Sequence, residues 1–194
     1  PEGWTVTNIS EVFQNTKGVV KTGPFGSNLH ASDYAEEGVP LILVKHVTDG
    51  FIALEELPLV RDDKAKDLTD YVLQEDDIVV TRVGRVGSTA IVPDFQAGWM
   101  FSGQTLRIRI PEGPLSSKWL ACWFKTHHFN HAIESSAVGS TRASLNTKIL
   151  ETLKFVMPPV ELQKYFEQVV SIDIKRINLN RRESLTLAKI RDTL

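Results

Sequence analysis

A long segment without a helix-breaking residue limits most strongly the folds open to this chain. After Pro158-Pro159, residues 161–194 contain neither glycine nor proline, and leucine, isoleucine and valine recur along them at helical spacing. Proline presets φ and suits a position just before or within a first helical turn. The pattern predicts a rigid joint followed by one helix, which at 1.5 Å per residue would be roughly 50 Å long.

The apolar residues of this helix form two stripes at 100° per residue. The first stripe holds Leu162, Phe166, Val170, Ile174, Ile177, Leu185 and Ala188, and the second, about a third of a turn away, holds Val169, Ile172, Leu179, Leu187, Ile190 and Leu194. Neither is a strict seven-residue repeat. A helix with two stripes needs two partners, such as its own domain and another helix. The alternative is a terminal helix folded entirely onto its own domain.

The preceding residues predict a small α+β body. Expected strands are Trp4–Thr7, Val39–Val47, Phe51–Leu54 after an Asp49-Gly50 turn, Ile78–Arg82, Ser88–Val92, Trp99–Ser102 and Thr105–Ile110, with a loop over Lys17–Asn28. Expected helices are a short exposed one over Asp62–Asp70, one over Lys118–Ser135 capped by Ser116 or Ser117, and one over Thr147–Thr152. The predicted fold is a small, strongly bent mixed or antiparallel sheet domain with few helices, followed by a long, projecting, coiled-coil-like C-terminal helix.

Composition indicates a reduced, cytoplasmic protein. Cys122 is the only cysteine and lies in the apolar run Trp119–Phe124, so we expect a reduced thiol in the core. No apolar run approaches the roughly 20 residues that a bilayer crossing needs. The N-terminus lacks the basic-then-apolar pattern of a signal peptide.

The net charge of −2 argues against a uniformly basic nucleic-acid binder, but the charges are unevenly distributed. Residues 1–160 carry −4 and residues 161–194 carry +2. Asp49–Asp77 alone contains ten acidic and three basic residues, so the rest of residues 1–160 is net basic. Phosphate binding needs a basic face rather than a basic protein. We therefore expect the acidic block to be a solvated surface turned away from any bound DNA.

Five fragments in order resemble one family closely. They are Gly3-Trp4 with Val6, Lys21-Thr22-Gly23-Pro24-Phe25-Gly26-Ser27, Gly38-Val39-Pro40-Leu41-Ile42, Asp77-Ile78-Val79-Val80-Thr81-Arg82-Val83-Gly84-Arg85-Val86-Gly87, and a closing Gly139-Ser140-Thr141-Arg142-Ala143-Ser144-Leu145-Asn146 with Pro158-Pro159-Val160-Glu161-Leu162-Gln163. Each is weak alone, whereas the ordered set is specific. The chain resembles the target-recognition domain and spacer helix of type I restriction–modification specificity subunits.

The resemblance implies a domain organisation and a function. Residues 1–157 would be the DNA target-recognition domain, and residues 158–194 a spacer and dimerisation helix that acts as a ruler. Such subunits usually carry two of each, so this chain would be a natural half-subunit or an excised fragment. Implied partners are double-stranded DNA and the methyltransferase and restriction or translocase subunits. No cofactor is implied. An isolated chain would pair with a second copy through its helix.

The expected DNA contacts lie in polar loops of these motifs. They are Lys21, Thr22, Ser27, Lys45, His46, Arg82, Arg85, Ser140, Thr141 and Arg142. Arginine forks suit phosphates or guanine, and short hydroxyls after a glycine can donate to phosphate oxygens. Structural interpretations stay open for each. The hairpin can be a solvated turn, Ser144 or Asn146 can cap a helix, Pro24-Phe25 can plug the core, and Lys45-His46 can be an exposed strand end.

Patterns that would indicate catalysis are weak. His127 and His131 are four residues apart but lack a third-ligand motif. Asp62-Asp63-Lys64 imitates part of a nuclease motif within a run of charges. Pro158-Pro159 lacks the amide and aromatic neighbours that hold a flipped base. We predict a non-enzyme. The alternatives are a protein-interaction or assembly module without DNA binding, and the recognition domain of a fused methyltransferase–nuclease.

Overall fold

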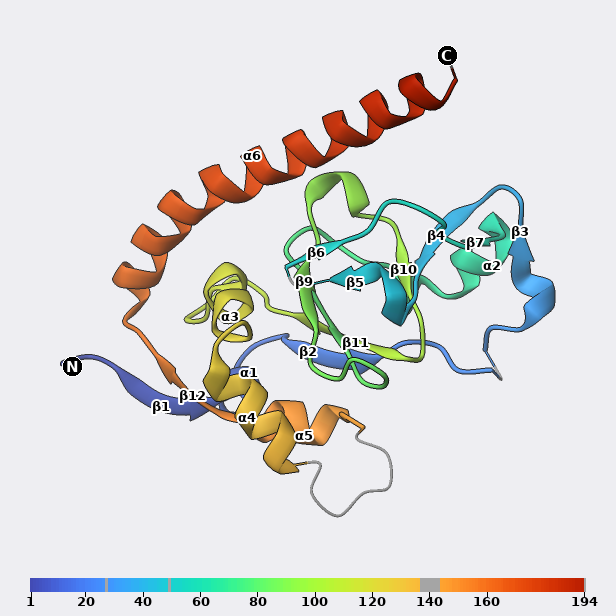
Figure 1. The fold of residues 1–194 in the computed structure, drawn as a ribbon. Helices are drawn as coiled ribbons and strands as arrows, with labels where there is room; N and C mark the ends of the chain where they lie inside the picture. The colour runs from blue at the N-terminus through green and yellow to red at the C-terminus, as the bar shows by residue number, and fades with distance from the viewer. Residues whose placement is uncertain (27, 49, 137–143, 194) are drawn as a thin grey trace.

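The computed structural model describes residues 1–26, 28–48, 50–136 and 144–193. Small sheets form the body, short helices cover one end of it, and one long helix passes along its side (Figure 1). The strands are β1 (Thr5–Asn8), β2 (Val19–Thr22), β3 (Tyr34–Ala35), β4 (Val39–Ile42), β5 (Val47–Thr48), β6 (Phe51–Ile52), β7 (Leu59–Val60), β8 (Ile78–Thr81), β9 (Thr89–Ile91), β10 (Met100–Phe101), β11 (Thr105–Arg109) and β12 (Lys154–Met157).

Most of the helices are short. The α-helices are α1 (Ile9–Phe13), α2 (Asp62–Asp67), α3 (Ser117–Trp123), α4 (His127–Ser136), α5 (Thr147–Thr152) and α6 (Val160–Asp192), and the 3-10 helices are η1 (Ala31–Asp33), η2 (Val44–His46), η3 (Thr69–Tyr71) and η4 (Asp94–Gln96). The predicted α+β class and the long C-terminal helix are confirmed. Side-chain oxygens of Ser116 and Asn146 cap α3 and α5, as predicted for α3 and left open for α5.

An antiparallel sheet in the order β2-β11-β8-β9 lies at the centre of the body. All four residues of β8 are buried, because both faces of the sheet are covered. Ile78 and Val80 belong to the core cluster beneath the helices, whereas Val79 belongs to a second cluster on the opposite face. The continuous apolar run of β8 therefore follows from alternation between two cores. The predicted 78–92 hairpin is confirmed.

A mixed sheet in the order β10-β4-β7-β3 lies beside the first, with β10 parallel to β4. The strand predicted over Val39–Val47 ends at Ile42, and η2 follows it. This difference has a physical cause. The backbone N–H of Leu43 donates to Nδ1 of His46 at 3.0 Å, and the N–H of His46 returns to the Leu43 carbonyl, so the chain turns back on itself. His46 is therefore buried, not placed at an exposed strand exit.

Two further predictions about local structure were wrong. The loop expected over Lys17–Asn28 contains β2, which pairs with β11. The helix expected over Lys118–Ser135 is divided into α3 and α4. The hydroxyl of Thr126 donates to the carbonyl of Trp123 at 2.7 Å, and the backbone there tightens. The break brings the rings of Phe124 and Phe129 to a centroid distance of 4.5 Å inside the core.

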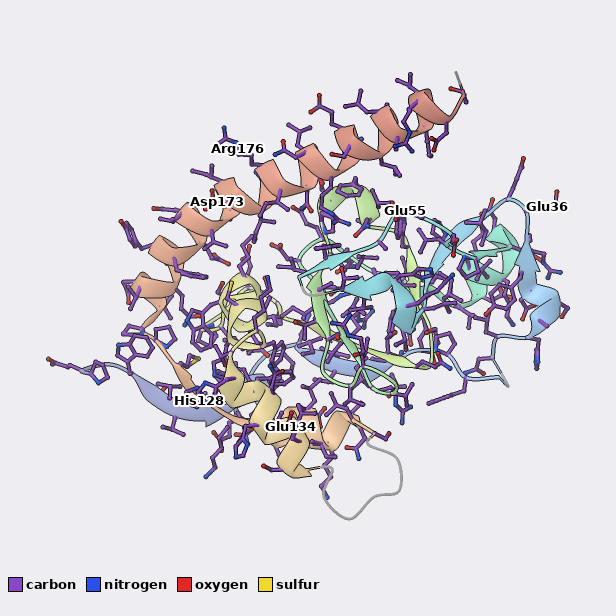
Figure 2. All side chains as sticks on the ribbon, in the orientation of Figure 1. Glu36, Glu55, His128, Glu134, Asp173 and Arg176 are labelled. Carbon is purple, nitrogen blue, oxygen red and sulfur yellow. The ribbon has the colours of Figure 1, made fainter. Side chains whose placement is uncertain are left out.

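One side of α6 lies against the body, as Figures 1 and 2 show. Phe166, Val170, Ile174, Leu185 and Ala188 of the first stripe are half-buried, whereas Leu162 and Ile177 are exposed. The second stripe faces solvent from Val169 to Ile190, and its Leu194 lies outside the described residues. Part of the prediction thus holds, since one stripe contacts its own domain. None of the helices in the described ranges has the length and apolarity needed to cross a membrane.

Candidate nucleic-acid interface

A groove of about 1090 Å³ opens where several of the sequence motifs meet. Its walls come from residues 24–26, the hairpin residues 82–84, the turn 102–104 and Ser144. These segments are distant in sequence but adjacent because β2, β11 and β8 are neighbours in one sheet. Residues 24–26 form the end of the blue segment before the first grey break on the right of Figure 1, whereas α6 runs along the upper side of the body. Two of the predicted DNA-binding loops, together with the described end of the third, therefore converge on one surface.

Arg82 holds these segments together. Its Nε donates to the carbonyl of Leu145 at 3.3 Å, and its Nη1 donates to the carbonyl of Gly103 at 3.4 Å. The guanidinium lies 5.5 Å from the ring centroid of Phe25, and the Leu145 N–H donates to the Arg82 carbonyl. Much of the donor capacity of Arg82 is used within the protein. The Arg82 side chain therefore has a structural role in addition to the predicted contact with DNA.

The rest of the hairpin is shaped by its own hydrogen bonds. The hydroxyl of Thr81 donates to the carbonyl of Arg85 and accepts from the N–H of Ser88 at 3.0 Å. Gly84 and Gly87 have φ of 69° and 86°, a left-handed conformation that glycine adopts without strain. This tight turn leaves Arg85 exposed at the tip. The turn geometry thus presents the arginine side chain at the surface, as the motif predicts.

Phe25 differs from its predicted alternative role as a core plug. Pro24 is buried, but Phe25 is 54% exposed on the groove wall. Close backbone contact at Gly23 sets this arrangement, because its N–H donates to the Thr105 carbonyl and a Cβ there would overlap the carbonyl of Ser102. Gly103 similarly lies under Pro24 and Phe25. The Gly-Pro-Phe-Gly sequence therefore pins its backbone to the sheet and presents an aromatic ring.

Lys45 and His46 have separate environments. Nζ of Lys45 contacts Oε2 of Glu56 at 2.8 Å on the surface. This hydrogen bond, and then the lysine charge, lower the pKa of Glu56. His46 is 2% exposed, and its burial, followed by the charge of Lys45, lowers its pKa. The predicted contact between His46 and DNA is contradicted by this burial, whereas Lys45 is accessible.

Lys21 and Thr22 lie on β2, not in a loop. Nζ of Lys21 contacts Oδ2 of Asp70 at 2.6 Å and lies 4.7 Å from the ring centroid of Tyr71. The hydrogen bond from Lys21, and then its charge, lower the pKa of Asp70. Thr22 is half-buried opposite Leu106. Acidic residues of the 49–77 block thus contact two of the predicted DNA-binding lysines, so the block is not uniformly turned away from that surface.

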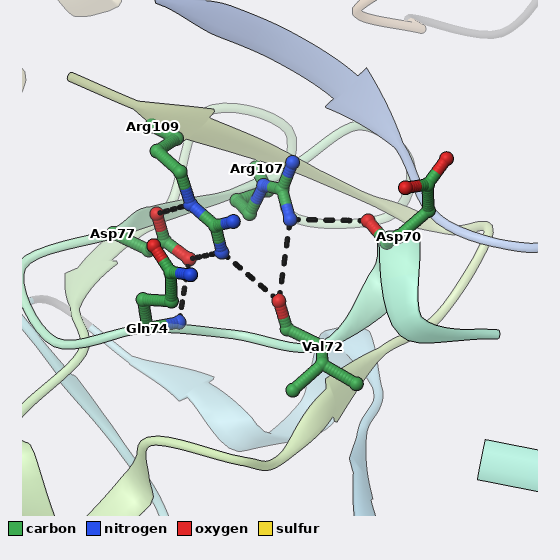
Figure 3. A network of polar contacts seen from close by, with 6 residues as sticks. All are labelled: Asp70, Val72, Gln74, Asp77, Arg107 and Arg109. Carbon is green, nitrogen blue, oxygen red and sulfur yellow. Dashed lines mark hydrogen bonds and ion pairs between the residues drawn. The ribbon is translucent and has the colours of Figure 1, made fainter. Parts of the chain in front are cut away.

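Asp77, another acidic residue of the 49–77 block, has a structural role, as Figure 3 shows. Asp77 is 1% exposed and accepts from Arg109, with 2.8 Å between Oδ1 and Nε and 2.6 Å between Oδ2 and Nη2. Arg109 and Arg107 also donate to the carbonyl of Val72, and Arg107 to that of Asp70. The expectation of a solvated block is therefore wrong for Asp77. This network attaches the 70–77 segment to β11 and accounts for both arginines of that strand.

Four predicted contact residues, Ser27, Ser140, Thr141 and Arg142, lie outside the described residues. Sequence reasoning missed Tyr34 and Gln104, which line the groove. Both come from short segments without a motif. It also missed Lys125 and Asn130, which line a cavity of about 340 Å³ together with Arg85. A lysine just after a helix gives no local signal of such a position, because only the break between α3 and α4 creates it.

Two histidines of α4 and the Asp62-Asp63-Lys64 run have local partners in the described part of the chain. The rings of His127 and His128 lie 4.1 Å apart on α4, and Asp63 pairs with Arg61 at the start of α2. Within the described ranges, no three His, Cys, Asp or Glu side chains gather as metal ligands. Cys122 is half-buried, and its burial raises the pKa of its thiol. The groove instead combines exposed aromatic rings, an amide and nearby cations, which suits nucleic-acid binding.

Comparisons with known proteins identify a matching family and several relatives. The family model described as "Type I restriction modification DNA specificity domain" matches residues 1–187. Among curated relatives, the putative type I restriction enzyme MjaX specificity subunit of Methanocaldococcus jannaschii is 26% identical over 182 residues, which cover 88% of this chain and 39% of that protein. The MjaVIII specificity subunit of the same organism is 22% identical over 194 residues, covering 97% and 44%.

Solved structures show a similar fold. The type I restriction-modification S subunit from M. genitalium matches with a TM-score of 0.67 at 15% identity, over 99% of this chain and 44% of that one. The HsdS subunit from Thermoanaerobacter tengcongensis matches with a TM-score of 0.56 at 17% identity, over 94% and 40%. The type IIG restriction endonuclease BpuSI also matches, with a TM-score of 0.54 at 10% identity, over 77% and 24%. The chain spans less than half the length of each of these proteins.

Proposed function

Because this chain belongs to the type I restriction–modification DNA specificity domain family, we propose that it recognises a sequence in double-stranded DNA and binds it along the groove beside Phe25. The observation that carries the proposal is the convergence of residues 24–26, 82–84, 102–104 and Ser144 on one surface. Loops that are separated in sequence but joined at one groove can contact several positions of a duplex together. A scaffold of paired strands holds them in place.

The side chains along the groove divide by chemistry. Phe25 and Tyr34 offer exposed rings that can wedge against bases, and Gln104 offers an amide that can read adenine edges. Lys45, which pairs with Glu56, and Arg85 do not line the groove, but both are exposed cations that can contact phosphates and set the register of the protein on the duplex. Arg82 acts mainly as a positioning residue between the loops.

The remaining predicted contact residues differ in how much each is expected to contribute to DNA binding. Ser27 and the Ser140-Thr141-Arg142 run have the polar composition of phosphate-binding loops. Lys21 would contact DNA only after leaving Asp70, which makes it a weaker contributor. Thr22, half-buried on β2, adds at most a hydroxyl at the strand end. His46 is omitted, because it is buried.

The proposal extends to the rest of the assembly, supported by the family and by the exposed face of α6. Residues 1–157 serve as the recognition domain for half of a bipartite target, and residues 158–194 serve as its spacer. Methyltransferase and restriction subunits carry out methyl transfer and cleavage, so this chain is not catalytic. The exposed stripe of Val169, Ile172, Leu179, Leu187 and Ile190 pairs with a second such helix, supplied by another copy when the chain is alone.

Duplex binding tests this function directly. The chain should bind random duplex with an affinity that falls steeply with salt, because phosphate contacts release counterions. Phe25→Ala should weaken binding at least about fivefold, since a stacked or wedged ring contributes about 1–3 kcal/mol. Tyr165→Ala is the matched control, because Tyr165 is an exposed aromatic on α6. Salt-independent or absent duplex binding would instead support an assembly module.

A further inference from the structure

Several contacts attach α6 to the body, and two of its polar attachments lie far apart along the helix. The first is at its start, where Gln163 is 3% exposed and donates to the carbonyls of Pro114 and Pro158, both at 2.8 Å. The second lies about two-thirds of the way along α6, where Nη2 of Arg181 donates to the carbonyl of Ile52 at 3.1 Å. The guanidinium of Arg181 also lies 3.7 Å from the ring centroid of Phe51.

The spacing of these attachments gives them a common direction. Gln163 and Arg181 are 18 residues apart, which is five turns at 3.6 residues per turn and about 27 Å along the axis. Both side chains therefore leave the helix on the same side. An attachment at the start of the helix leaves its far end freer to pivot, whereas a second one on the same line restricts both pivoting and rolling about the axis.

The exposed apolar stripe lies opposite. Ile172 is nine residues from each anchor, or two and a half turns, which places it on the far side of the helix. It is 69% exposed, more than the other large apolar residues of the stripe. Arg176 lies on the same outer side and points away from the body in Figure 2. The anchors thus set which face of α6 is presented to another molecule.

The surroundings of Arg181 fit a specific attachment. Its neighbours across the contact, Phe51 and Glu55, belong to the β6 region, and together with Arg181 they line a cavity of about 350 Å³ between this region and the helix. Arg182 adds a weaker contact, with its guanidinium 5.0 Å from the ring centroid of Phe95.

We propose that Arg181 is a positioning residue that, together with Gln163, fixes the direction and the rotation of α6 relative to the DNA-binding groove. It touches no DNA. It determines the angle at which the helix leaves the domain, and hence the separation and orientation of two recognition domains joined through such helices. This last step rests on the proposed function, whereas the attachment of the helix does not.

Distance measurements between spin labels test the attachment without DNA. Labels at Lys66→Cys and Lys189→Cys, both exposed, in a Cys122→Ala background would report the position of the helix end relative to the body. The distance distribution should be narrow in the parent and at least about twofold broader in Arg181→Ala, because one anchor permits pivoting. Arg176→Ala removes an arginine from the outer face and should leave the distribution narrow.

A second variant guards against a folding defect. Phe51→Leu keeps an apolar side chain but removes the ring beneath Arg181, and it should broaden the distribution in the same direction. A narrow distribution in a folded Arg181→Ala or Phe51→Leu protein overturns the proposal. Equal broadening in Arg176→Ala also overturns it, because the effect would then not be specific to the attachment.

Binding to duplexes with two copies of a selected site tests the consequence for spacing. The parent should prefer one separation, and Arg181→Ala should lose at least about fivefold of that preference while its affinity for a single copy stays within twofold. If Arg181→Ala retains the spacing preference of the parent, Arg181 does not set the separation of the two recognition domains. If the parent binds no DNA, the proposed function fails, and the label distances still decide the role of Arg181 in the helix attachment.

Discussion

The side-chain oxygen of Gln163 accepts a hydrogen bond from the backbone N–H of Ser116 at 2.7 Å, across 47 positions of the chain. The amide nitrogen of the same glutamine donates to two carbonyls. Next to it, the hydroxyl of Ser116 donates to Glu167 at 2.6 Å and accepts from the N–H of Trp119. One buried amide therefore links the start of α6 to the cap of α3.

Gln163→Leu is expected to lower the free energy of unfolding by about 1–3 kcal/mol, because a buried N–H and two carbonyls lose their partner. Chemical denaturation measures this change. Gln168→Leu on the exposed side of the same helix is the matched control and should have little effect. Equal stability of the two variants would show that Gln163 does not hold the helix.

Gly23→Ala is expected to destabilise the domain by more than about 2 kcal/mol, because its Cβ would overlap the backbone of Ser102. Gly26→Ala, three residues later in the same motif, is the control. A Cβ at Gly26 has no neighbour within 4 Å, so its melting temperature should stay nearly unchanged. Thermal unfolding measures the stability of both variants. A Gly23→Ala protein as stable as the parent would contradict the described backbone contact.

Stability should decrease as pH falls from 7 to 5.5, in part through His46. Burial lowers the pKa of His46 in the folded state, so between that pKa and the ordinary value of about 6.5 the unfolded chain binds more protons. The contribution is complete above the ordinary pKa and is lost as pH falls below it. His46→Gln should flatten this part of the stability curve. If the stability of His46→Gln falls with pH as steeply as that of the parent, protonation of His46 is not the cause of the loss.

Arg85→Ala is expected to weaken duplex binding and to reduce the slope of log Kd against log salt by about one, the signature of one lost phosphate contact. The melting temperature should stay nearly unchanged, because Arg85 lies exposed in a turn shaped by Thr81 and two glycines. Arg176→Ala on α6 is the charge-matched control. Unfolding, or unaltered binding, would rule out this assignment. The parallel prediction for Arg142 concerns a residue outside the described ranges.

Leu179→Glu with Leu187→Glu is expected to convert a dimer of the isolated chain into a folded monomer. Both residues lie on the exposed stripe, and burial of one such side chain contributes roughly 1.5–3 kcal/mol. Sedimentation or light scattering reports the mass. Asn180→Glu with Thr186→Glu adds the same two charges at exposed polar positions of α6 and should leave the dimer largely intact. A parent chain that stays monomeric at tens of micromolar would refute the pairing.

Much of the local structure could be read from the sequence, because its signals lie within a few residues of the elements that they specify. The Pro158-Pro159 joint and the glycine-free segment predicted α6, and a cap at Ser116 or Ser117 predicted the start of α3, where Ser116 is the cap. Alternating apolar runs and glycine turns predicted the 78–92 hairpin. The break after Trp123 escaped prediction, because it depends on how aromatic rings from α3, α4 and β12 meet in the core.

The sequence by itself determined the family, the α+β class and the long helix, since ordered motifs and helical periodicity are local properties. Only the tertiary structure decided which polar side chains are accessible. Lys45 and His46 are adjacent in sequence, yet one lies on the surface and the other is buried. Arg82 and Arg85 share a turn, yet one bridges two distant loops and the other is exposed. These differences arise from contacts between residues far apart in the chain, which no local pattern encodes.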